Sequence, residues 1–213
     1  MRRCVVLVFL LVGLTLSACS VPPESRVALS EPGEAAYDKR LVGNWYLIPG
    51  KNVTSYLHIT PGKETGYLNI IGIIAFNNDD NDYQFGAVRW FRATAYASEI
   101  DGQTYYNVKR VSGTGDDYTA PEESPGFIII RADLTDEDSL ILRSMDTRVF
   151  GKLVKVPGRK VEGKYRDEKV SYRIMDLSRP ELVDMIRVFP PAEFYSEERP
   201  FRRLKPDAEK AKP

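Results

Sequence analysis

Residues 84–111, QFGAVRWFRATAYASEI-DG-QTYYNVKRV, decide the fold of this chain. The runs Gln84–Ile100 and Gln103–Val111 contain many β-branched and aromatic residues, which favour extended strands. Between them stands Asp101-Gly102, a dipeptide that tolerates the positive backbone angles of a two-residue hairpin turn. The stretch therefore predicts a long antiparallel β-hairpin.

The chain on both sides of this hairpin continues the β pattern, with turn signals such as Pro49-Gly50 between apolar runs. The expected strands outside the hairpin are Gly43–Ile48, Val53–Thr60, Gly66–Phe76, Gly126–Ala132 and Ser139–Ser144, with Val149–Val156 and Lys169–Ile174 as weaker candidates. About seven to nine strands at roughly 10-residue spacing predict a mainly β fold, either an antiparallel barrel or a sandwich.

One short helix is expected near the C-terminus, over Arg179–Val188. Ser178 precedes Pro180 and Glu181, which is the order of a capping residue, a first-turn proline and an acid three positions after the cap. Apolar residues then recur with helical spacing until Pro190-Pro191 ends the run. Residues 205–213 form a charged tail that we expect to be disordered.

The first residues of the chain have the pattern of an export signal. A thirteen-residue apolar run, Cys4 to Leu16, follows Arg2-Arg3. The run is shorter than the about 20 residues that span a bilayer, and it has the length of the apolar part of a secretory signal. It ends at Leu16-Ser17-Ala18-Cys19, where small residues precede a cysteine.

Leu16-Ser17-Ala18-Cys19 resembles the lipobox of bacterial lipoproteins. The resemblance implies that residues 1–18 are a signal peptide, that Cys19 is lipidated through a thioether, and that N-terminal acyl chains hold the protein on a membrane. Ser20, which is not Asp, then implies the outer membrane on its periplasmic side. In a cell with one membrane, the protein would face outward from it.

Composition limits what the mature chain can bind. The chain has 30 Lys and Arg and 30 Asp and Glu, and cleavage would remove two arginines and no acid. The resulting small negative charge lacks the positive clusters that bind nucleic acid. With Cys4 removed and Cys19 alkylated, no disulfide is possible, so stability must come from an apolar core.

We expect three parts in the mature chain. Residues 19–36 contain many Pro, Ser, Glu and Ala, and we interpret them as a flexible tether with a reach of about 55 Å. Residues 37–204 form a single β-rich domain, and the charged tail follows it.

Gly43-x-Trp45 resembles the motif that opens the first strand of lipocalins. The resemblance implies a ligand-binding barrel in which Trp45 closes one end and a late basic residue, Arg202 or Arg203, packs over the indole ring. Of the two, Arg203 is our choice for the barrel-closing pair. The indole face would offer this arginine a cation–π contact.

Small side chains alternate along the hairpin's first strand, at Ala87, Ala93, Ala95 and Ala97. Pointing inward, they would leave room for a ligand in a barrel; pointing outward, they would pack closely under the helix. For the first case, the aromatic residues that we expect to line the pocket are Tyr56, Trp90, Tyr96, Tyr105 and Tyr106.

The sequence offers no strong catalytic or metal motif. His58 is the only histidine, which disfavours both a Ser-His-Asp triad and a zinc site. Asn77–Asp82 lacks the Gly and the Glu of a calcium-binding loop, which leaves an irregular ion site as an open alternative. Gly113–Asp117 lacks the Lys-Ser/Thr pair of a phosphate loop. We expect no cofactor, no metal and no enzymatic activity.

Three functions remain open. The first is a binding module for a small apolar or amphipathic ligand near the membrane. The second is an envelope interaction or structural protein that has no ligand cavity. The third is a hydrolase of cell-wall or lipid substrates that uses carboxylates.

Overall fold

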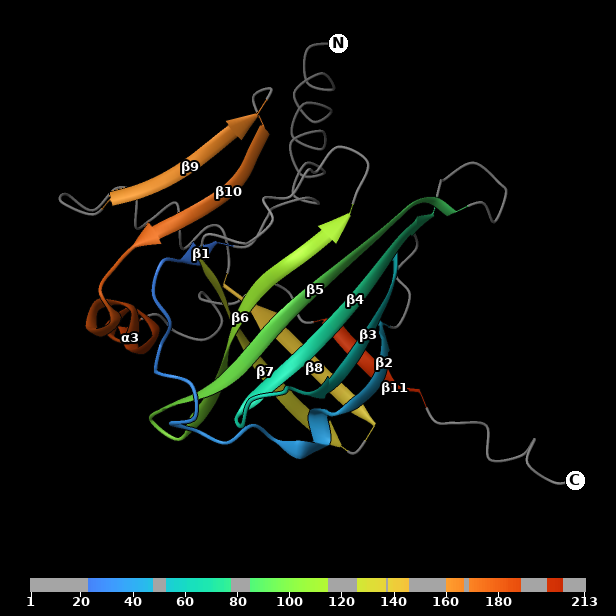
Figure 1. Cartoon of the computed structure of the whole chain (residues 1–213), viewed down its shortest axis with the longest axis horizontal. Coiled ribbons are helices and arrows are strands. Elements are labelled where there is room, and N and C mark those ends of the chain that lie inside the picture. Colours follow the sequence, from blue (N-terminus) through green and yellow to red (C-terminus); the bar gives the residue numbers. More distant parts are fainter. Residues whose placement is uncertain are drawn as a thin grey trace, which may run out of the picture.

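The computed structural model of the protein describes residues 23–47, 53–77, 85–114, 126–136, 138–145, 160–166, 169–188 and 199–204. Within these residues the fold is mainly β. Eight strands form a closed antiparallel barrel, and one α-helix and three further strands lie outside it (Figure 1). The expectation of a barrel or sandwich with one short helix is confirmed, and the structure selects the barrel.

The barrel strands follow one another in sequence around the wall. The pairing of β6 with both β5 and β7, and of β11 with both β8 and β2, closes the circle. The strands are β2 (Gly43–Leu47), β3 (Val53–Pro61), β4 (Tyr67–Asn77), β5 (Phe85–Ile100), β6 (Gln103–Thr114), β7 (Phe127–Asp136), β8 (Ser139–Ser144) and β11 (Arg199–Arg203). Because consecutive strands run up and down, β7 begins at the barrel end opposite the start of β2.

The β5–β6 hairpin has the predicted turn. Ile100 pairs with Gln103, and both turn residues have positive φ angles, 50° at Asp101 and 75° at Gly102. These angles match the right-handed twist of the flanking strands, which is why Asp-Gly is favoured here.

Alternation along the barrel strands supplies two separate hydrophobic cores. Inward residues form the inner core, which comprises Leu41, Trp45, Leu47, Leu57, Ile59, Leu68, Ala93, Ala95, Ala97, Tyr106, Val108, Leu140 and Phe201. Outward residues of β5 to β8 join the outer core, which comprises Leu29, Ile100, Tyr105, Ile129, Met145, Met175, Leu177, Leu182, Met185 and Ile186. The segment around Leu29, the end of β10 and α3 cover this outward face.

The helix α3 spans Arg179–Val188, as predicted. The Ser178 backbone N–H donates to Glu181 Oε2 at 2.8 Å, and the Ser178 hydroxyl lies 2.6 Å from the same oxygen. The Ser178 carbonyl accepts the first helical bond, from Leu182 at 3.0 Å. The Glu181 carboxylate thus satisfies the Ser178 N–H, one of the backbone donors that a helix N-terminus otherwise leaves free. The apolar stripe of the helix then packs on the barrel wall.

The expected tether is wrong for the residues from 23 onward. Glu24–Ser25 form β1, which pairs antiparallel with β7 and parallel with β10 (Lys169–Asp176). Glu24 and Ser25 are buried, and so is Leu29 in the outer core. A low apolar content predicted disorder, but β1 is held by backbone pairing, which composition does not reveal.

Besides β1, two further strands were not predicted. β9 (Lys160–Arg166) pairs with β10, and β11 completes the barrel although it contains Pro200 and three arginines. Proline and charge disfavour a strand by propensity, so β11 exists because β2 and β8 leave a position for it. Three predicted parts of the chain lie outside the described residues: the strand Val149–Val156, residues 1–22 with Cys19, and the tail 205–213.

Candidate functional site

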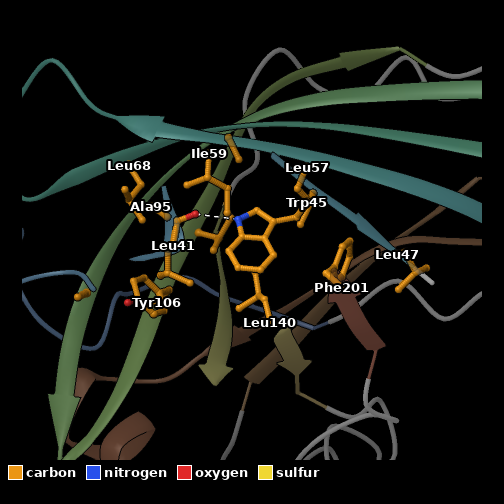
Figure 2. Close-up of a cluster of buried hydrophobic side chains, with 13 residues drawn as sticks. Leu41, Trp45, Leu47, Leu57, Ile59, Leu68, Ala95, Tyr106, Leu140 and Phe201 are labelled. Carbon is orange, nitrogen blue, oxygen red and sulfur yellow. Dashed lines mark hydrogen bonds between the residues drawn. The ribbon is translucent and has the colours of Figure 1, made fainter. Parts of the chain in front are cut away.

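Trp45 occupies the barrel end at which β2 begins. Its side chain has no exposed surface, and its Nε1 donates a hydrogen bond of 2.9 Å to the carbonyl of Leu41. Leu41 ends the short 3₁₀-helix η1 (Lys39–Leu41) that precedes β2. Figure 2 shows the indole surrounded by inner-core side chains such as Leu140. The ring thus fills this end, as the Gly43-x-Trp45 resemblance implied.

Arg203 packs over Trp45 from the last barrel strand. Its Cζ lies 4.3 Å from the centre of the indole ring, within the range of a cation–π contact. Its Nη1 donates to the carbonyl of Val42 at 3.0 Å, and its Nη2 donates to the carbonyl of Arg40. The predicted late basic residue is therefore Arg203, because Arg202 is exposed on the opposite side of the same strand.

Gly43 is needed for this arrangement. A Cβ at position 43 would lie 2.5 Å from Nη1 of Arg203, well inside van der Waals contact. The φ angle of Gly43 is +151°, a conformation that other residues rarely adopt. The glycine of Gly-x-Trp thus leaves the space that the guanidinium occupies.

Tyr106 lies on the inner wall, as predicted, but it belongs to the plugged end. Its hydroxyl oxygen accepts a hydrogen bond of 3.3 Å from the backbone N–H of Asp38, next to η1. Burial raises the pKa of the Tyr106 hydroxyl above its usual value. Tyr106 packs in the inner core together with Trp45, so it helps to close this barrel end as well as to line the inner wall.

The small side chains of β5 face the barrel interior. Ala93, Ala95 and Ala97 are buried in the inner core. Of the two orientations that the sequence left open, the structure therefore has the inward one. Gly72 on β4, which has no side chain, extends this surface of small residues. Phe91 packs directly over Gly72, so that a Cβ at position 72 would lie 2.1 Å from the Phe91 ring.

Arg110 also belongs to the inner wall. It pairs with Ala93 across the β5–β6 ladder and follows Val108 by two residues, and both of those side chains face inward. Its Nε is buried and has no hydrogen-bond partner in the described part of the chain. This residue was not among the predicted site residues. The signal that could have indicated it is a charged residue at a position of β6 where the alternation places side chains inside the barrel.

Tyr96 and Tyr105 do not line the barrel interior. Tyr96 packs edge-on against Tyr67 and Phe127 and donates a hydrogen bond of 3.3 Å to the Ser30 carbonyl. Tyr105 is part of the outer core. Both are buried because another layer covers the outside of the wall. Their assignment to the pocket is wrong, since burial by α3 and the N-terminal segment was not visible in the strand pattern.

Tyr56 and Trp90 also point outward, and they are exposed. Their exposed fractions are 43% and 38%. Tyr56 pairs with Ile73 and Ile73 with Trp90 across three adjacent strands. These three residues form what we call the outer ladder. The prediction that Tyr56 and Trp90 line a pocket is wrong, because the strand phase places them on the opposite face from Leu57 and Ala93.

A buried polar network fastens the N-terminal segment to the outer wall. The Asn107 side chain is fully buried; its Oδ1 accepts from the Leu29 backbone N–H at 2.8 Å, and its Nδ2 donates to Ser98 Oγ at 2.7 Å. The Ser30 and Ser98 hydroxyls lie 2.5 Å apart. This network was not predicted, because its one signal in the sequence is a single Asn among the aromatic and apolar residues of the strand.

Among the described residues, the remaining candidates are not brought together with other groups that could catalyse a reaction. His58 is exposed, and its Nδ1 lies 2.6 Å from Oδ1 of Asn44 on the next strand. No group of three metal-ligating side chains occurs in the part of the chain that the structure describes. The proposed ion loop lies outside that part, apart from Asn77 at the end of β4. Among the described helices, none has the length and apolarity to cross a bilayer.

Comparisons with known proteins identify no relative of this chain. No family model, no curated protein and no solved structure matches it.

Proposed function

We propose that this protein is a lipid-anchored envelope lipoprotein whose barrel binds a small apolar or amphipathic ligand without catalysis. The observation that carries the proposal is the asymmetry of the barrel interior. Trp45, Arg203 and η1 fill one end, while the adjacent wall of β5 presents Ala93, Ala95 and Ala97. Small inward side chains in a barrel leave space that larger ones would fill.

The position of β1 supports a role next to the membrane. Glu24 is five residues after Cys19, so a lipid on Cys19 is at most about 17 Å from β1. β1 pairs with the start of β7, at the barrel end opposite to η1. The end without the Trp45 plug would therefore lie nearest the lipid surface, where an amphipathic ligand would enter or leave.

The anchor can be tested by intact-mass measurement of the native protein extracted from membranes. We expect a chain that begins at Cys19 and carries a diacylglyceryl group and an N-terminal acyl chain. The Cys19→Ser protein should carry neither. An unmodified native chain that retains residues 1–18 would contradict the proposal.

Ligand binding can be tested by native mass spectrometry of the mature chain with Cys19→Ser, exported behind a cleavable leader. Every described contact lies within residues 23–204, so this chain contains the whole described fold. We expect a co-purified small molecule that dissociates on unfolding and is identified by extraction. An empty barrel that also fails to bind added amphiphiles would contradict a binding module.

A second candidate, an envelope interaction protein, is favoured by the outer ladder. Tyr56, Ile73 and Trp90 expose adjacent apolar surface on one wall, and such patches mark interaction surfaces. Site-specific cross-linking from position 73 in cells would test it. A single protein captured from position 73 but not from exposed Arg92 would favour this candidate.

A further inference from the structure

Arg110 contrasts with other arginines of the barrel wall. Arg131 and Arg143 both contact Asp133 on the outward side of β7 and β8. Arg110 faces inward, and its buried Nε has no hydrogen-bond partner among the described residues. Its nearest inner-wall neighbours on the ladder are Ala93 and Val108, which have no polar side-chain atoms.

An unsatisfied buried donor in a folded protein calls for an explanation, because such groups are rare and destabilising. Arginine remains charged at any physiological pH. Its guanidinium matches the oxygens of a carboxylate or a phosphate. A ligand oxyanion beside Arg110 would satisfy both the charge and the free Nε–H.

The geometry points to Arg110 as the residue that binds the oxyanion head group of an amphiphilic ligand, with the tail on the apolar inner wall. This inference rests on the proposed function and specifies its ligand class. Apolar contacts for the tail come from the small side chains of β5 and from Ile70 and Phe91, which pack against the inner core. The head-group chemistry is a carboxylate or phosphate on a hydrocarbon chain.

The test uses four probes and two variants of the mature Cys19→Ser chain. Dodecanoate, dodecyl phosphate and dodecanol share one tail and differ in the head, and inorganic phosphate has a head without a tail. Arg110→Met removes the guanidinium but keeps an apolar side chain. Arg92→Met is the matched control, because Arg92 is exposed on the outer face of the neighbouring strand.

Calorimetric titration should show that both anionic amphiphiles bind more tightly than dodecanol, by roughly ten- to hundredfold. Arg110→Met should remove this preference and leave dodecanol binding unchanged, and Arg92→Met should keep the preference. Inorganic phosphate should bind much more weakly than dodecyl phosphate, and equal binding would overturn an amphiphile site.

Two further results separate the inference from the proposed function. If dodecanol and dodecanoate bind equally and Arg110→Met changes nothing, the role of Arg110 is wrong while the binding module stands. If no probe with a tail binds, both are wrong.

Stability provides a second readout. The ligand-free Arg110→Met protein should have a higher thermal midpoint than the unsubstituted protein, because the variant no longer buries an unsatisfied donor. A binding role thus predicts that affinity for anions falls while stability rises. A lower midpoint would indicate a structural arginine and would overturn the inference.

Discussion

The inner and outer cores are built on the same strands, yet they depend on different parts of the chain. The inner core is assembled almost entirely from alternate residues of the barrel strands, with Leu41 from η1. The outer core uses the other phase of β5 to β8 and is completed by Leu29, the end of β10 and α3. The inner core therefore follows from local alternation, while the outer core requires segments that are distant in sequence.

This difference explains which aromatic residues were misassigned. Alternation states which side chains share a face, but it does not state what covers that face. Tyr105 and Tyr56 both point away from the barrel interior. Tyr105 is buried under the outer layer, while Tyr56 is exposed because no described element covers that wall. The comparison predicts distinct responses to substitution in the two cores.

The largest effect is expected for Trp45→Ala, in the inner core. Loss of a fully buried Trp should lower the free energy of unfolding by about 3–5 kcal/mol, and it also removes the surface on which Arg203 packs. Chemical denaturation followed by circular dichroism measures the change. Trp90→Ala, the control on the outer ladder, should cost less than about 1 kcal/mol. Equal losses would contradict the plug.

Leu182→Ala should destabilise the outer core by about 2–4 kcal/mol. Leu182 has no exposed surface, while Val188 on the same helix is 76% exposed. Val188→Ala should therefore have almost no effect. Hydrogen exchange should show that protection falls most in α3 and around Leu29. A uniform loss in all barrel strands would mean that the two cores unfold as one.

Asn107→Ala should lower the free energy of unfolding by about 1–3 kcal/mol, because the Leu29 N–H would be buried without an acceptor. The amide of Leu29 should also lose protection from hydrogen exchange. Asn69→Ala is the control, since the Asn69 side chain makes only an exposed bond, to the Pro61 carbonyl. Unchanged protection at Leu29 would argue against the network as the fastening of the N-terminal segment.

The smallest effect, absent at neutral pH, concerns Tyr96 in the outer layer. Burial raises the pKa of Tyr96 to about 12 from the usual 10.0. The folded state therefore disfavours the phenolate, so this contribution to stability is complete below pH 10 and is lost between pH 10 and about 12. Thermal midpoints over this range should fall less in Tyr96→Phe than in Tyr56→Phe. Identical alkaline profiles would contradict a buried hydroxyl.

Local patterns were sufficient for much of the fold. Alternation and turn residues predicted the strands from Gly43 to Ser144 with small errors at their ends, and the capping residues predicted α3 at its observed bounds. The Trp45–Arg203 contact was also predicted, by resemblance. Apart from that long-range contact, these features depend on a residue's own conformational preference or on neighbours a few positions away, which the sequence contains directly.

The sequence by itself determined the alternation along the strands, the hairpin turn and the helix, because each is set by short-range sterics and by periodicity. Only the tertiary structure decided that residues 23–30 are part of the fold, that β11 closes the barrel, and that Arg110 faces inward with a buried Nε that no described residue bonds. These features depend on which distant segments cover each face of the wall. Whether a side chain is buried and hydrogen-bonded depends on how these segments assemble. The same positions of tyrosines in the sequence are therefore compatible with a pocket, a second core or an exposed patch.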